Sequence, residues 1–337
     1  MEIHNNYIDI SIPKSILDYR SIPIATKCLT GAYVVLTLAL FALRCSAYYS
    51  LNTPDTAVTF ASIQNPVLQM IPSDIFKYPY SIVLSNLVDT SVCKFVLNLT
   101  NLLIGGSFIE RNWNSSNEMF KFTLGIGSIT NLLVMLVTVL GHFFLPDMVD
   151  LHVPLDGNYS VLIGFPIVYR QLLPETTIIN INKPTFLSKN FRFKLLPILV
   201  LTFMTVTQLV VFRHFSNILS IWITFMSCWV YLRFYQTLPA SATGSHTDYY
   251  TPVIGDASDT FQLIYFFPDI IKPVLRPVFD KIYAIVCVEH RWMHPFETTD
   301  VDKGNDIAEQ RGAKKVAPDV QDRRRQLALD VLQERMV

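Results

Sequence analysis

Long runs of apolar residues, separated by shorter polar segments, dominate the pattern along this chain. A helix needs about 20 mostly apolar residues to cross a bilayer, with about 17 to 25 allowed. Five runs reach this length, and in the second of them only the later part is apolar enough to span. These runs cover residues 26–45, 80–109, 119–145, 195–212 and 216–235. They predict an all-α protein that crosses a membrane several times.

A further apolar run, at 159–169, is too short to cross a bilayer alone. It contains Pro166, which removes a backbone hydrogen bond from a helix. Such a helix is tolerated at membrane depth only where neighbouring helices shield it. We therefore expect a six-helix transmembrane domain at 26–236, with this short fourth helix at its centre.

The segments outside this domain are more polar. Residues 1–25 show no pattern typical of a cleavable signal peptide, so we expect the first apolar run to remain as a signal anchor. Residues 237–260 are expected to be a flexible linker. In the C-terminal tail, 291–337, the stretch 297–318 is charged and almost free of aromatic residues, which predicts disorder. A terminal amphipathic helix is expected at 319–336.

The segment 261–290 contains an amphipathic pattern. Charged residues recur every three or four positions while apolar residues fill the rest of the helical wheel; the charged ones are Asp269, Lys272, Arg276 and Asp280. Pro273 and Pro277 interrupt this pattern. It predicts a helix at 268–288 that lies in the membrane interface. A seventh membrane span is the alternative.

Composition agrees with a membrane protein. Of the 337 residues, 51% are hydrophobic and 16% are charged, whereas soluble domains carry about 25% charged residues. The five cysteines form no CxxC pair, so we expect apolar fillers and no disulfide or metal framework. The formal net charge is zero, and nothing in the sequence indicates a nucleic-acid partner.

The distribution of Lys and Arg predicts the topology. Residues 14–27 and 170–194 are rich in Lys and Arg, as are the last hundred residues. The loop 146–158 contains no Lys or Arg and three aspartates. Six helices with both termini in the cytosol satisfy these facts. The loop at 213–214 would then be luminal despite Arg213.

Ser160, which follows the sequence DGNY, is a candidate nucleophile at the start of the fourth helix. A serine hydroxyl attacks only when a neighbouring base takes its proton. Residues 215–235 contain no histidine, and His214 lies beside Arg213 at the predicted membrane edge. We expect Ser160 to be a helix-start residue that bonds free N–H groups.

Two groups of histidines are candidates for a metal site. His142 and His152 share a loop with aspartates, and His290 and His294 lie one turn apart near Cys287. Neither spacing matches a recognised ligand pattern. We expect no metal and no cofactor.

The strongest local motif ends the second apolar run. In IGGSFIERNWNSS, Glu110, Arg111 and Trp113 follow a pair of glycines. Ionisable residues near membrane depth indicate a functional or structural site, and beside an aromatic they are also typical of an interfacial anchor. We expect Glu110 and Arg111 to lock the second helix to the third.

This motif resembles the rhomboid superfamily, where a Gly-x-x-x-Glu-x-x-Trp-Gly-Ser-like string ends the second helix. Lys94 and Asn98 stand at the positions of that superfamily's His-x-x-x-Asn signature. In active rhomboids a Gly-x-Ser-Gly motif opens the fourth helix, and a histidine on the sixth acts as base. Alignment on Gly157 puts Tyr159 at the serine position and Ser160 at the second glycine, so the resemblance implies a rhomboid-like bundle without protease residues.

Three later strings resemble the transmembrane protein 115 family, a rhomboid-like branch that lacks protease residues. They are SCWVYLRFYQ at 227–236, FFPDIIKPV at 266–274 and DRRRQLAL at 322–329. With the Glu110 motif, the resemblance covers most of 26–336. It implies residence in the Golgi membrane and a part in Golgi-to-ER retrograde transport through partner proteins.

The predicted function is therefore a non-catalytic membrane scaffold or adaptor of the early secretory pathway. Its partners would be the lipid bilayer, membrane-protein cargo, and Golgi tethering or coat machinery; whether the chain forms a homo-oligomer stays open. The candidate partner-binding residues of the tail are Arg323, Arg324, Arg325, Leu327, Val331 and Leu332. The alternatives are an ER quality-control pseudoprotease of the derlin type and an active intramembrane serine protease.

Overall fold

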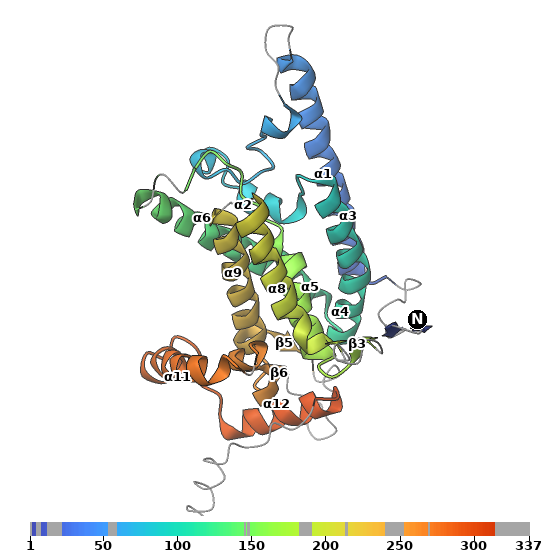
Figure 1. Cartoon of the computed structure of the whole chain (residues 1–337), viewed down its shortest axis with the longest axis vertical. Coiled ribbons are helices and arrows are strands. Elements are labelled where there is room, and N and C mark those ends of the chain that lie inside the picture. Colours follow the sequence, from blue (N-terminus) through green and yellow to red (C-terminus); the bar gives the residue numbers. More distant parts are fainter. Residues whose placement is uncertain are drawn as a thin grey trace, which may run out of the picture.

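A computed structural model shows a bundle of helices with smaller elements at both of its ends (Figure 1). The structure describes residues 2–4, 8–11, 22–52, 59–144, 146, 149–181, 191–212, 215–239, 253–268 and 270–313.

Five helices are long and apolar enough to cross a membrane, at 24–51, 92–113, 116–144, 193–210 and 216–235. A shorter apolar helix occupies 160–172. The prediction of an all-α membrane protein, compatible with a rhomboid-like bundle, is confirmed. The first helix, α1 (Ile24–Leu51), continues six residues past its predicted end at 45.

Most of the long helices contain a π-helical turn. The second is α3 (Val92–Thr100), η4 (Asn101–Gly105) and α4 (Gly106–Trp113), and the third is α5 (Ser116–Phe120), η5 (Lys121–Ile126) and α6 (Gly127–Phe144). The fifth is η8 (Phe193–Leu195), α8 (Leu196–Thr207) and η9 (Gln208–Phe212), and the sixth is α9 (Phe215–Val230) and η10 (Tyr231–Tyr235).

The fourth helix, η6 (Ser160–Gly164) and α7 (Phe165–Leu172), lies at the centre of the bundle. All eight residues of α7 are buried. Gly164 permits this packing, because a Cβ there would lie 2.9 Å from the Phe122 ring and 3.0 Å from the Cys228 sulfur. Shielding by neighbours is what the short, Pro166-containing run required.

The second apolar run does not form one helix from residue 80. The connection after α1 contains η1 (Phe60–Ser62), η2 (Pro72–Asp74), α2 (Ser81–Leu84) and η3 (Ser85–Leu87). The chain then becomes extended at Val88, and α3 begins only at Val92. An antiparallel bridge between Met70 and Leu155 ties this connection to the loop before the fourth helix.

A small antiparallel sheet joins the N-terminal segment to the loop after the fourth helix. Its strands, in order of pairing, are β1 (Glu2–His4), β2 (Ile8–Ser11), β3 (Thr177–Ile181) and β4 (Phe191–Arg192). Ile10 pairs with Ile179 across the β2–β3 register. The polar composition of residues 1–25 did not predict these strands.

The C-terminal part is more structured than its composition predicts. After η10 come β5 (Thr237–Leu238), β6 (Val253–Ile254), η11 (Asp259–Phe261), η12 (Leu263–Phe266), α11 (Lys272–Tyr283), η13 (Ala284–Glu289) and α12 (Thr298–Gln310). The strands β5 and β6 pair with each other, so the predicted linker is ordered at both ends, and 240–252 lie outside the description.

The prediction of disorder at 297–318 is wrong for α12. Glu297 and Asp300 form a reciprocal capping box that satisfies donors at the helix start. Ile307 is buried, and Gly304 packs so closely that a Cβ would lie 2.7 Å from the Ser258 backbone nitrogen. Few apolar residues therefore suffice, because this helix rests on residues 257–259 of the same chain. The predicted terminal helix at 319–336 lies outside the described residues.

Candidate functional site

The start of the fourth helix carries the two residues that would decide catalysis. Tyr159, at the serine position of the rhomboid-like alignment, is buried, and its hydroxyl donates to Asp156 Oδ2 at 3.2 Å. Ser160 is buried as well, and its hydroxyl has no hydrogen-bond partner among the described residues. It faces the third helix, where a Cβ on Gly127 would lie 3.1 Å from Ser160 Oγ.

No described histidine forms the hydrogen bond with Ser160 Oγ that a general base would make. His142 instead places Nδ1 2.6 Å from the Val149 carbonyl oxygen, and His214 lies outside the described residues. The expectation that Ser160 bonds free N–H groups at the helix start is also wrong, because its hydroxyl contacts none of them.

Gly157 brings this loop against the connection before α3. A Cβ at Gly157 would lie 2.3 Å from Ser85 Oγ and 2.9 Å from Asn131 Nδ2. Asn131 donates to Ser85 Oγ at 3.1 Å and to the Ile82 carbonyl at 3.0 Å. The glycine at this position thus permits a close approach between the fourth-helix loop, η3 and α6.

Lys94 and Asn98 lie one turn apart on α3 and face two different carboxylates. The Lys94 ammonium forms an ion pair with Asp156, the same carboxylate that accepts from Tyr159. Asn98 Nδ2 donates to Asp89 Oδ2 at 2.9 Å, and the Tyr33 hydroxyl donates to the same oxygen. The sequence predicted positions 94 and 98 as structural. It did not identify these partners, because both aspartates lie in loops.

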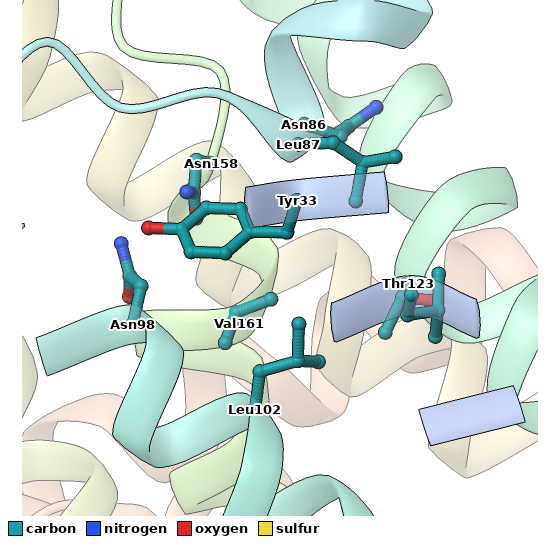
Figure 2. A pocket seen from close by; sticks show the side chains of 9 residues that line it. Tyr33, Asn86, Leu87, Asn98, Leu102, Thr123, Asn158 and Val161 are labelled. Atoms are coloured by element: carbon teal, nitrogen blue, oxygen red, sulfur yellow. The ribbon is translucent and has the colours of Figure 1, made fainter. Parts of the chain in front are cut away.

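A small cavity opens beside these groups. It measures about 10 Å³ for the centre of a water-sized sphere, which is about the room that one water needs. In Figure 2 the Tyr33 ring enters it with the hydroxyl toward Asn98 and Asn158. The side-chain amide nitrogen and oxygen of Asn158 and the Oδ1 of Asn98 are buried and have no hydrogen-bond partner among the described residues. The lining residues are Leu29, Tyr33, Asn86, Leu87, Asn98, Leu102, Thr123, Asn158 and Val161.

Asp89, which precedes α3, is buried. Burial raises the pKa of its carboxyl above the ordinary value, and hydrogen bonds from Tyr33 and Asn98 lower it by less. Asp156 raises it further and Lys94 lowers it, each to a smaller extent. The arrangement suits a structural polar network. Within it, the Asp89 carboxyl keeps its proton more readily than an exposed carboxyl does.

Glu110 does more than connect the second and third helices. Its carboxylate accepts the backbone N–H of Ala25 at 3.0 Å and that of Thr26 at 2.7 Å. The hydroxyls of Thr26 and Ser116 donate to it at 2.8 and 2.5 Å. The prediction of a lock between the second and third helices missed its main partner, the first turn of α1. That turn needs an external acceptor because Pro23, its N-cap residue, offers none.

The other residues of the Glu110 motif differ in how deeply they are buried. Trp113 is fully buried and packs edge-on against Phe122, with ring centroids 5.6 Å apart. Arg111 is half-buried. Gly105 lets the fourth helix approach: a Cβ there would lie 1.7 Å from the Tyr169 hydroxyl, which donates to Asn101 Oδ1 at 3.0 Å.

Two buried arginines hold the C-terminal segment to the bundle. Arg233, in the WVYLRFYQ string, donates to the carbonyls of Asp256 and Ser258 at 2.5 and 2.6 Å. Arg170 donates to the Lys194 and Thr260 carbonyls at 3.0 and 3.1 Å.

Aromatic contacts complete this attachment. The Arg170 guanidinium stacks 3.9 Å from the centre of the Phe266 ring. Trp229, also in the WVYLRFYQ string, donates its indole N–H to the Phe261 carbonyl at 3.1 Å. Residues 253–267 therefore form a cap on one end of the bundle. The hydropathy pattern does not predict this cap. The WVYLRFYQ string contains two of the residues that bind it, Trp229 and Arg233.

No group of three or more His, Cys, Asp or Glu side chains within the described ranges is placed to hold a metal ion. The tail residues Arg323, Arg324, Arg325, Leu327, Val331 and Leu332 lie outside those ranges.

Comparison with known proteins identifies a family. Residues 27–337 match the family model described as "Eukaryotic integral membrane protein (DUF1751)". The chain is 54% identical to the Transmembrane protein 115 homolog of Saccharomyces cerevisiae, over all of this chain and 99% of that protein. No solved structure matches the chain significantly.

More distant relatives match over a smaller part of the chain. Identity is 26% to Rhomboid-like protein 19 of Arabidopsis thaliana, over 68% of this chain and 69% of that protein. It is 23% to human Transmembrane protein 115, over 74% of this chain and 65% of that protein. The six apolar helices, the Glu110 motif and the full-length match agree: the chain belongs to the transmembrane protein 115 family of integral membrane proteins, which is related to rhomboid-like proteins.

Proposed function

We propose that this chain is a non-catalytic, rhomboid-like scaffold of the early secretory pathway, acting in Golgi-to-ER retrograde vesicle transport. The surroundings of Tyr159 and Ser160 are the main support for a role without catalysis. A phenol bonded to Asp156 occupies the serine position, and the neighbouring hydroxyl contacts no base in the described structure. The bundle would then bind membrane-protein cargo without cleaving it.

The polar interior supports a structural use of the former active-site region. Lys94, Asp156 and Tyr159 form one continuous contact, and Asn98, Asp89 and Tyr33 form another. Residues that satisfy each other in this way hold helices together and leave no reactive group exposed to a substrate.

The arrangement of the ends supports a common side for both termini. Glu110 links the start of α1 to the start of the third helix through Thr26 and Ser116. Glu118 near that start accepts from Tyr231 at the end of the sixth helix at 2.7 Å. With the Lys and Arg distribution, this favours both termini in the cytosol and the loop 146–158 in the lumen.

The tail supplies the proposed contact with traffic machinery. Arg323, Arg324 and Arg325 precede the apolar positions Leu327, Val331 and Leu332, a pattern suited to a groove on a partner. Tethering or coat proteins at the Golgi membrane are the proposed partners.

Affinity capture from gentle detergent tests this function. Wild type, a 316–337 deletion and Ser160→Ala would be compared, with microscopy of each. The proposal expects Golgi localisation, loss of tethering or coat proteins in the deletion, and unchanged captures for Ser160→Ala. A variant with Arg323, Arg324 and Arg325 replaced by Ala separates the basic cluster from the rest of the tail.

Two outcomes would reject the proposal. If Ser160→Ala traps an intact membrane protein that wild type cleaves, the chain is a protease. If all variants reside in the ER and capture degradation machinery, the derlin-type alternative holds.

A further inference from the structure

One helix outside the bundle carries an apolar face that the described chain leaves open. In α11 and η13, apolar side chains recur every three or four residues, so they share one side of the helix. They are all exposed, with Val274 at 70% and Val288 at 58%. The set, here called the apolar stripe, is Ile271, Val274, Val278, Ile282, Ile285 and Val288.

Contacts on other sides of the helix fix its orientation. Phe279 packs on Phe267 with ring centroids 5.8 Å apart, and Cys287 is buried. At the helix start the Lys272 ammonium lies 4.8 Å from the centre of the Tyr265 ring. The apolar stripe is therefore held away from the protein by packing on the cap.

The position of α11 relates this stripe to the bilayer. Figure 1 shows α11 running across the long direction of the bundle, at the end where α9 and its continuation finish. The last span ends at Tyr235, and Arg233 ties this end to residues 256–258. A helix placed crosswise where the spans end lies at the level of the lipid headgroups.

Charge excludes a seventh span and indicates the kind of surface. α11 and η13 carry Lys272, Arg276 and Lys281 against Asp280 and Glu289, and the segment is absent from the helices apolar enough to cross a membrane within the described ranges. A helix with an apolar side and an excess of cations binds at the surface of a membrane that contains anionic lipids. Trp292 follows at 73% exposure, a residue typical of interfaces.

We propose that α11 and η13 lie in the headgroup layer of the same membrane, with the apolar stripe in the acyl boundary and the cations toward anionic lipid. The helix would fix the depth of the cap that Arg170 and Arg233 attach to the bundle. This inference does not rest on a role in vesicle transport.

Site-directed labelling of the full-length chain in nanodiscs tests it. A background lacking the five native cysteines would receive single cysteines at Val274, Val278 or Ile282, with Asp280 as the matched site on the charged side. Spin labels on the stripe are expected to be accessible to oxygen and protected from a water-soluble nickel complex, and the label at 280 to show the reverse. Equal exposure of all four labels to the nickel complex would overturn the proposal.

A second experiment needs no labels. Trypsin cleaves after Lys281 but not after Arg276, because Pro277 follows it, and insertion of the helix protects the Lys281 site. The double substitution Val274→Asp and Val278→Asp is expected to raise cleavage in nanodiscs about tenfold, since it charges two apolar positions that would lie in the acyl boundary. Each rate is divided by the cleavage rate of the same variant after unfolding, and the control Asp280→Ala should leave this ratio unchanged.

Lipid composition identifies the surface. Protection is expected to be stronger in nanodiscs containing phosphatidylserine than in phosphatidylcholine alone, and to weaken with salt. Protection that is equal in both kinds of nanodisc and unaffected by salt would overturn the proposal that the cations face anionic lipid.

Discussion

The carboxylate of Glu110 accepts the backbone N–H of Thr26 at 2.7 Å, across 84 positions of sequence. The contact makes a residue at the end of the second long helix the cap of the first. Such a cap normally comes from the residue directly before the helix. Here the capping contact also sets where two helices meet, so the stability of α1 depends on the position of α4.

Glu110→Ala should lower the stability of the whole bundle. Two N–H groups of α1 and the hydroxyls of Thr26 and Ser116 would lose their acceptor, at a cost of about 2–4 kcal/mol. Thermal unfolding in detergent measures this. Glu110→Gln keeps part of the acceptor and should cost less, while Glu289→Ala, at an exposed site, should cost almost nothing. Wild-type melting of Glu110→Ala would contradict the capping role.

The effects of substitutions at Gly105 and Tyr169 on the stability of the fold should not be additive. Gly105→Ala places a methyl group on the Tyr169 hydroxyl, so the helices must separate and stability should fall by about 1–3 kcal/mol. Tyr169→Phe removes that hydroxyl, and the double variant should therefore recover part of the loss. Gly125→Ala is the control: nothing lies within 4 Å of its Cβ, and the substitution should be neutral or slightly stabilising. Additive losses in the double variant would argue against the contact.

The ion pair of Lys94 and Asp156 should contribute measurably to the free energy of unfolding. Lys94→Ala leaves a largely buried carboxylate without its cation and should cost about 1.5–3 kcal/mol. Adding Asp156→Asn removes the charge, so the double variant should be more stable than the sum of single losses predicts. The exposed pair Lys77 and Asp74, 3.5 Å apart, is the comparison, and Lys77→Ala should change stability by less than about 1 kcal/mol. Equal effects at both pairs would contradict the assignment.

Asp89 predicts a dependence of stability on pH. Because burial raises the pKa of Asp89, the folded chain holds this proton at pH values where the unfolded carboxyl, with a pKa of about 3.9, has released it. Between those two pKa values stability falls as pH rises. Asp89→Asn cannot ionise, so wild type should lose stability relative to this variant from about pH 4 upward. Unfolding curves at several pH values would show parallel behaviour if Asp89 had no raised pKa.

The bundle was predictable because its signal is local. Each span is a run of apolar residues. The short length of the fourth run and its Pro166 predicted a helix at the centre of the bundle. Boundaries were less accurate where polar residues intervene. Asp89 lies between η3 and α3 and accepts hydrogen bonds from Tyr33 and Asn98, and neither contact can be recognised from hydropathy.

The cap was not predictable, since its interactions join distant parts of the chain. Arg170 reaches the carbonyl of Thr260, 90 positions away, and Asn305 binds the carboxylate of Asp259 at 3.0 Å. In the sequence, Arg170 counts only as a charge that indicates topology, and Asn305 only as one polar residue of a segment expected to be disordered. Arg170 binds a backbone carbonyl, which every residue has and no sequence pattern identifies, and Asn305 binds a side chain 46 positions away.

Labelling with a fluorophosphonate tests whether Ser160 is an activated nucleophile. This reagent reacts with a serine whose proton a base can take. Purified wild type and Ser160→Ala would be labelled in detergent beside an active rhomboid protease as positive control. We expect equal background labelling of both forms of this chain. Labelling of wild type that disappears in Ser160→Ala would show an activated serine and would rule out a non-catalytic role.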